Sequence, residues 1–181
     1  METSIPLEES GAAAIADFSH AHSQIIAHLM SFSCLPGALQ SPALQSSARH
    51  VAAEALAFFH ETINAHHVEE EQLLFPEVLS RATDGTEREQ ILSMIEQLSR
   101  EHRQVEALWA GLEPALQQIA DGRSLALDGQ AVQQLVLDYG GHAAFEEAEF
   151  LPLCREILRR DLARGEFAPT LNGQLEKIHS L

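Results

Sequence analysis

The stretch HHVEEEQLLFPEVL, residues 66–79, contains the pattern around which this chain is organised. His66 is followed four residues later by Glu70, and Pro76 lies ten residues after the histidine. Two residues four apart on an α-helix project from the same face, one turn apart. The spacing therefore predicts a helix that presents an imidazole and a carboxylate together. Pro76 is expected to kink this helix or to end its regular hydrogen bonding.

The same pattern occurs a second time in HAAFEEAEFLPLCREIL, residues 142–158. His142 precedes Glu146 by four residues and Pro152 by ten. A single His–Glu pair at this spacing is usually a coincidence on a helix surface, whereas two pairs with the same proline offset indicate a duplicated device. Because imidazole and carboxylate together suit iron, manganese or zinc, the repeat predicts a metal site.

Apolar residues at helical spacing on either side of both motifs predict four helices and no strand. The third helix has the most regular period, with steps of four and three between apolar positions from Ile91 to Leu116. Connections of about six to ten residues, with Gly and Pro in them, separate the helices. These features predict an all-α fold, an antiparallel up-down-up-down four-helix bundle. The predicted helices cover residues 12–33, 43–81, the stretch from a Thr86 cap to the connection at 120–129, and 130–160.

We expect the bundle to occupy residues 12–160, after a flexible leader at 1–11 and before a C-terminal tail at 161–181, for which a short helix is one alternative. Counting residues along the helices shows one mismatch in length, between the first helix and the second. Either the second helix overhangs the bundle, or residues 38–50 form a separate piece that packs across its end.

Single histidines lie on the apolar faces of the two helices that lack a His–Glu pair. The segment FSHAHSQIIAHL around His22 is similar to LSREHRQVEALW around His102. Each half of the chain therefore pairs a helix bearing one inward histidine with a helix bearing histidine and glutamate. The six predicted ligands are His22, His66, Glu70, His102, His142 and Glu146.

The negative charges of the two glutamates favour bound metal ions at these positions. A carboxylate buried in a bundle core without a partner costs several kcal/mol or stays protonated. Two cations bridged by both carboxylates and capped by two histidines each would neutralise them. Ions about 3.5–4 Å apart are usual in two-metal sites. A solvent-derived bridge would bring each ion to five ligands, which leaves one further position for a small ligand.

These motifs resemble the hemerythrin-like family, whose members carry a His-His-Glu cation-binding domain. The resemblance covers roughly residues 12–160 and includes HHVEEEQLLFP, EHRQV and HAAFEEAEFLP. It implies a non-haem di-iron centre, oxo- or hydroxo-bridged, that binds dioxygen, nitric oxide or other small oxidants, with the six residues above as ligands. Zinc and manganese are possible substitutes for iron.

Two departures from the oxygen carriers of this family stand out. The carriers have a second histidine one turn after the first on the third helix, where this chain has Glu106, and an aspartate five residues after the fourth-helix histidine, where this chain has Glu146 at four. Four histidines and two glutamates are more similar to the bacterial branch that includes di-iron proteins repairing iron–sulfur clusters. Those proteins carry an extra Cys-containing N-terminal domain, which we do not expect in this protein.

Three further residues keep two interpretations each. His67 lies three residues before Glu70 and so could share its face, but the second motif has Ala143 there, which favours His67 as an outer-shell or surface residue. Glu106 is either a seventh ligand or an exposed glutamate. Tyr139 is either a hydrogen-bond donor to a bound oxygen species or a core tyrosine.

Composition limits the remaining function classes. The net charge of −16 argues against nucleic acid or an anionic membrane as a partner. Cys34 and Cys154 have no paired spacing, and the N-terminus METSIPLEESG is unlike a signal peptide, so we expect a cytoplasmic protein. The leading hypothesis is a di-iron protein that binds, senses or scavenges a small ligand, as part of a stress response. The alternatives are iron–sulfur cluster repair or iron donation, a di-iron oxidase or peroxide-reducing enzyme, and a bundle stabilised by zinc.

Overall fold

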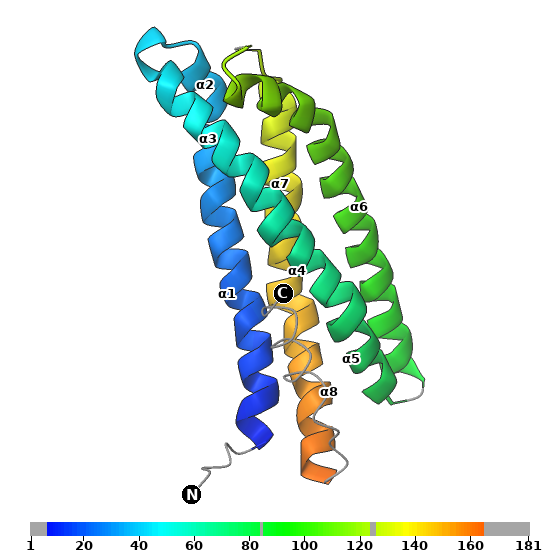
Figure 1. Ribbon diagram of the computed structural model, residues 1–181. Coiled ribbons are helices and arrows are strands. Elements are labelled where there is room, and N and C mark those ends of the chain that lie inside the picture. Colours follow the sequence, from blue (N-terminus) through cyan, green and yellow to red (C-terminus); the bar gives the residue numbers. More distant parts are fainter. Residues whose placement is uncertain (1–6, 84, 124–125, 165–181) are drawn as a thin grey trace, which may run out of the picture. The chain divides into compact units, whose positions relative to one another are not determined.

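All regular structure in the described part of the chain is helical, which confirms the predicted all-α class (Figure 1). The computed structural model describes residues 7–83, 85–123 and 126–164. The first helix begins at Leu7, five residues before the predicted start. The C-terminal tail from residue 165, with its expected short helix, lies outside the described residues.

Four long helical stretches make up this part of the chain, as predicted. The first is α1, Leu7–Ser33, and the third is α6, Thr86–Ala120. The second comprises α3 (Gln45–Phe58), η2 (Phe59–Ile63), α4 (Asn64–Glu69), η3 (Glu70–Leu74) and α5 (Phe75–Arg81). The fourth comprises α7 (Gly129–Phe145), η4 (Glu146–Phe150) and α8 (Leu151–Arg164). Two short elements, α2 (Leu35–Leu39) and η1 (Pro42–Leu44), stand between the first and second stretches.

Both His–Glu motifs contain a π-helical turn that begins at the glutamate. The turn η3 starts at Glu70 and η4 starts at Glu146. In each case a proline, Pro76 or Pro152, occupies the second position of the α-helix that follows. Proline lacks the N–H that an α-helix would use at this point, and a π turn widens the helix by one residue just before it. The expectation that Pro76 ends regular α-helical hydrogen bonding is therefore confirmed, in the form of a π turn.

The extra residue in each π turn changes which side chains are buried after the glutamates. Helical spacing in the sequence predicts that the inner face continues from Glu70 to Leu73 and from Glu146 to Leu153, but both leucines are only half-buried. Leu74 and Cys154, one position further on, are fully buried in their place. The prediction was wrong because it assumed a uniform period of 3.6 residues, whereas each π turn advances the inner face by one residue.

The chain packs into two compact units, each with its own apolar core. The first unit comprises Met1–Ala21, His66–Ser99 and Ala144–Leu181. Its core includes Phe75 and Phe150, whose rings meet edge to face with centroids 5.3 Å apart. This geometry is favourable because the positive edge of one ring faces the negative face of the other.

The second unit comprises His22–Ala65 and Arg100–Ala143. At its centre Phe59 stacks on Trp109, with centroids 4.1 Å apart and planes 4° apart, and both residues belong to the core. The short helix α2 packs against α3 here and buries Leu35 and Leu39. The second long stretch therefore begins at Gln45. Of residues 38–50, those before Gln45 include the end of α2 and all of η1, two separate short elements, and the rest belong to α3.

Gly140 and Gly141 lie within regular α7. Two adjacent glycines weaken a helix, and in the sequence they indicate either the close approach of another backbone or a local distortion. A Cβ added at either position would meet no atom of the described residues within 4 Å, so no close approach requires them. The irregular turn of this helical stretch lies at η4 instead.

None of the helices in residues 7–83, 85–123 and 126–164 combines the length and apolar character needed to cross a membrane.

Candidate metal centre

In the first unit, His66 and Glu70 lie on one face as their spacing predicts. His66 Nε2 is 3.2 Å from Glu70 Oε1, and the side chains are 4% and 0% exposed. The Phe18 ring covers His66, with centroids 5.8 Å apart. Glu146 in the same unit is also 0% exposed. Two fully buried carboxylates with an imidazole beside one of them fit a cation better than an apolar core.

Cys154 is buried near these carboxylates, and their negative charges affect its thiol. Burial of its thiol, together with the negative charges of Glu146 and Glu70, raises the pKa of Cys154 far above its ordinary value of 9.0. A thiol binds metal as the thiolate, which this environment disfavours. Cys154 belongs to no potential metal group of the described residues and lies in the apolar core.

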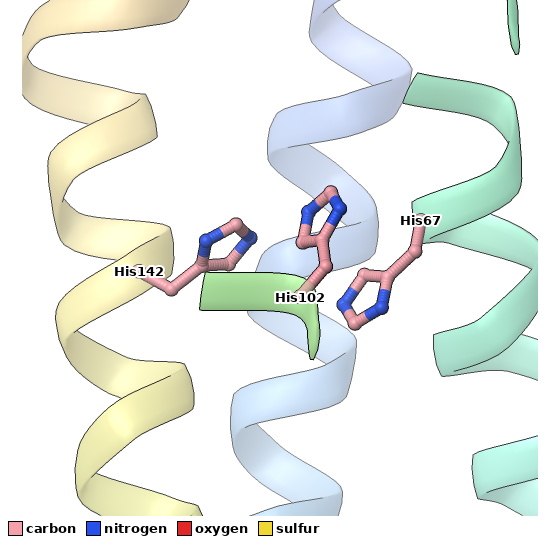
Figure 2. Close-up of side chains that lie close together, drawn as sticks. All are labelled: His67, His102 and His142. Atoms are coloured by element: carbon pink, nitrogen blue, oxygen red, sulfur yellow. The ribbon is translucent and has the colours of Figure 1, made fainter. Parts of the chain in front are cut away.

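In the second unit, three predicted histidines come from three helices. His22 lies on α1, His102 on α6 and His142 on α7, and all are buried. The rings of His102 and His142 have centroids 4.7 Å apart (Figure 2), and those of His22 and His142 are 6.5 Å apart. The grouping of three buried imidazoles in an otherwise apolar core fits metal binding, because neutral imidazole is a common metal ligand.

Glu101 is a candidate site residue that the sequence does not single out. Its Oε2 lies 3.1 Å from Nδ1 of His142, where it accepts a hydrogen bond from the ring. Such a carboxylate fixes which nitrogen carries the proton, and so assigns Nε2 of His142 as the atom that would meet a metal. Glu101 directly precedes His102 in the chain, and nothing in that adjacency reveals a contact with α7.

The six predicted ligands fall into two groups of four buried residues. One group is His22, His66, Glu70 and Glu146, and the other is Glu70, His102, His142 and Glu146. Within each group the potential ligand atoms all lie within 4.8 Å of one another. Both carboxylates, Glu70 and Glu146, belong to both groups. That these residues bind a metal remains a prediction.

The residues whose roles were left open are also placed. His67 is 1% exposed, so its interpretation as a surface residue is wrong. Glu106 is half-buried, pairs with Arg103 at 3.0 Å, and belongs to no potential metal group of the described residues. Tyr139 is a core residue whose ring lies 5.7 Å from that of His142.

Comparison with known proteins agrees with this arrangement. The model of the hemerythrin HHE cation binding domain matches residues 10–154. The chain belongs to this family. The match covers all six predicted ligands and both prolines of the repeat, and it confirms the resemblance seen in the sequence. Membership in a cation-binding family, together with the buried His and Glu groups, indicates a metal-binding protein.

The chain is also similar to a protein of Haemophilus influenzae (strain ATCC 51907 / DSM 11121 / KW20 / Rd). It is 23% identical over 141 residues, 78% of each chain, and its name is "Uncharacterized protein". No solved structure matches this member of the hemerythrin family significantly.

Proposed function

We propose that this protein holds two iron ions and binds, senses or scavenges a small ligand such as dioxygen or nitric oxide. The observation that carries the proposal is the pair of four-residue groups that share Glu70 and Glu146. One ion would be held by His22 and His66, the other by His102 and His142, and both ions by the two carboxylates. The ions would supply redox chemistry and an open position for the ligand.

The donor set favours iron over a purely structural zinc. Structural zinc sites are closed and tetrahedral, and they rely on cysteine and histidine. Combinations of histidine and carboxylate with positions left open are typical of non-haem iron. Here no cysteine of the described residues belongs to a potential metal group, and each of the two groups formed by the predicted ligands contains two histidines and two glutamates. Manganese or zinc could occupy the same donors.

Residues beside the predicted metal-binding side chains would orient those side chains and limit the access of water to the site. Glu101 accepts the Nδ1 proton of His142 and so orients that ring. Phe18 beside His66 and Tyr139 beside His142 place aromatic surface next to the ligands, which limits the access of water. A site with little water favours a small neutral ligand over a hydrated ion.

We also infer an antiparallel up-down order of the four helices and a cytoplasmic location. The short connections support the helix order. The location is supported by two cysteines that are not in a disulfide, Cys34 and Cys154, since oxidising compartments favour disulfides.

The proposal is tested by metal analysis and optical spectroscopy of protein purified without oxygen. We expect two irons per chain and oxo-to-iron charge-transfer absorption that changes with redox state and with added dioxygen or nitric oxide. His66→Ala and His142→Ala should each lose iron. His50→Ala is a matched control, because its ring is exposed and pairs with Glu54 on the same helix. If both ligand variants retain two irons per chain, the assignment is wrong.

A further inference from the structure

We propose that a groove in the second unit binds a small, neutral aromatic molecule, through a hydrogen bond from the indole of Trp109 to a carbonyl oxygen of that molecule. The groove lies between α1 and the helical run of α3 and η2, and Trp109 of α6 completes its lining. None of the residues that line it is a predicted metal ligand, so this site is separate from the proposed metal centre. The inference therefore does not depend on the proposed function.

The indole of Trp109 is buried and has one polar atom to satisfy. Its side chain is 4% exposed, and Nε1 meets no hydrogen-bond acceptor among the described residues. An indole N–H can only donate, and a buried donor without an acceptor costs free energy because its hydration is lost. Buried tryptophans usually have a partner for this group. A ligand oxygen in the groove would supply the acceptor.

Water alone is a poor occupant of this groove. A buried water molecule usually makes hydrogen bonds to two to four polar groups. The other polar side chains in the lining belong to His28, Ser31 and Glu54, and all three are exposed. The rest of the lining is apolar. One buried donor in an apolar groove therefore suits a ligand with one acceptor atom and an apolar body.

The size of the groove indicates how such a ligand would lie. Space for water-sized groups amounts to about 30 Å³, roughly twice what one water molecule needs, within about 390 Å³ of free space that is partly open to solvent. The narrow part admits a carbonyl group but not a whole ring. We therefore expect the carbonyl to enter the groove and the ring to lie in its open part.

Aromatic side chains in the lining favour a flat ligand. Phe59 stacks on the indole of Trp109, and the ring of Phe32 is tilted beside that indole, with centroids 6.2 Å apart. The exposed ring of His28 on α1 stacks on Phe58 of α3, with centroids 3.8 Å apart and planes 13° apart. Rings that are held in this way offer faces and edges against which another ring packs favourably.

The charges near the groove favour a neutral ligand. Glu54 belongs to the lining, and the chain has a net charge of −16. A carboxylate ligand would be repelled by these charges. A neutral carbonyl compound accepts the hydrogen bond from Trp109 without this cost.

The helix that forms one side of the groove is irregular at this point. The π turn η2 contributes Phe59 and Ile63 to the lining. The turns η3 and η4 each precede a proline, whereas the helix α4 that follows η2 contains none. Single π turns inside α-helices are frequent at functional sites. A binding role for the groove gives η2 a function that proline does not explain.

The aromatic lining is also confined to one half of the repeat. The alignment that pairs His66 with His142 and His22 with His102 also assigns counterparts to the three large aromatic residues of the lining. The counterparts of Phe58, Phe59 and Trp109 are Gln134, Leu135 and Leu29. The repeat thus duplicates the predicted metal ligands but not the groove. A helical pair of this kind does not need these aromatic side chains for its packing alone.

The test compares two probes of the same shape on the full-length protein, kept in Zn²⁺ because a diamagnetic ion leaves NMR signals sharp. Acetophenone carries a carbonyl oxygen, and isopropenylbenzene has a CH₂ group in its place. Trp109 is the only tryptophan of the chain, so one indole N–H signal in a proton–nitrogen correlation spectrum reports on it. Calorimetric titration measures the affinity for each probe.

Three variants accompany the wild type, and circular dichroism checks that each is folded. Trp109→Phe keeps an aromatic ring but removes the N–H. Ala55→Leu places a larger side chain in the lining. Ala57→Leu makes the same change at an exposed position outside the lining and is the matched control.

We expect acetophenone to move the indole N–H proton signal of the wild type further downfield than isopropenylbenzene does, because only acetophenone accepts a hydrogen bond. Trp109→Phe should bind acetophenone about five- to tenfold more weakly and isopropenylbenzene with unchanged affinity. Ala55→Leu should bind neither probe, and Ala57→Leu should bind both as the wild type does. Equal shifts with the two probes, or an acetophenone affinity that Ala55→Leu leaves unchanged, would overturn the inference even if Trp109→Phe failed to fold.

Discussion

Metal removal should lower the melting temperature of this protein by a predictable amount. Glu70 and Glu146 are each 0% exposed and belong to two potential metal groups, so the site exists only in the folded chain. An ion that binds the folded state alone, at a free concentration of 100 times its dissociation constant, stabilises it by about 2.7 kcal/mol. Two ions therefore contribute about 5.4 kcal/mol by the same relation.

For a chain of 181 residues each kcal/mol corresponds to about 2–4 °C in melting temperature. We therefore expect saturating Mn²⁺ or Co²⁺ to raise the melting temperature of the metal-free protein by about 10–20 °C. Scanning calorimetry with stepwise metal addition measures the shift. These ions avoid the redox chemistry of iron during heating.

Two substitutions divide this shift between the ions. His22→Ala affects one group only and should remove about half of the stabilisation, whereas Glu70→Gln affects both groups and should remove most of it. Without metal, Glu70→Gln should melt no lower than wild type, because a buried amide loses less on leaving water than a buried carboxylate. A wild-type shift of less than about 1 °C, or a full shift in Glu70→Gln, would refute the reasoning.

Two further predictions concern residues outside the proposed ligand set. Glu101→Gln should weaken metal binding about 10–100-fold, because it removes the carboxylate that accepts the hydrogen bond from His142 Nδ1. Competition with a chelator measures the metal affinity. Glu106→Gln, on the same helix, is the control and should leave that affinity unchanged. Burial pushes the pKa of Glu87 upward, but hydrogen bonds from the Thr83 backbone and Arg160 together hold it below its ordinary value of 4.5. A carboxyl group whose pKa is lower in the folded state stabilises the folded protein at pH values above its unfolded-state pKa. This stabilisation is lost as the pH falls through the folded-state pKa. The melting temperature of wild type should therefore exceed that of Glu87→Gln above pH 4.5, by an amount that shrinks on further acidification, and a gap independent of pH would contradict the assignment.

Local periodicity was sufficient to predict the helices and the face on which each motif presents its ligands. The regularly spaced residues from Ile91 to Leu116 lie in one uninterrupted helix. The offset of four residues places Nε2 of His66 3.2 Å from Oε1 of Glu70. Both results follow from the geometry of a single helix, which depends on residues close together in the chain. The repeat then identified the two remaining helices by the histidines on their apolar faces.

The structure determined two features that a uniform helical period does not predict: which residues are buried after each glutamate, and which residues from different helices are in contact. The π turns at Glu70 and Glu146 moved the inner face by one residue, so that Leu74 and Cys154 are buried in place of the predicted leucines. The hydrogen bond from His142 to Glu101 joins residues 41 positions apart, and no local pattern encodes such a contact.

The burial of His67 has the same origin. In sequence His67 is the second of two adjacent histidines, and only the packing of its helix against others determines that both are buried. The sequence by itself determined which chemistry this chain offers, because residue type and helical offset are properties of the chain alone. Tertiary packing decided which imidazoles and carboxylates meet, because that depends on the surroundings of each helix.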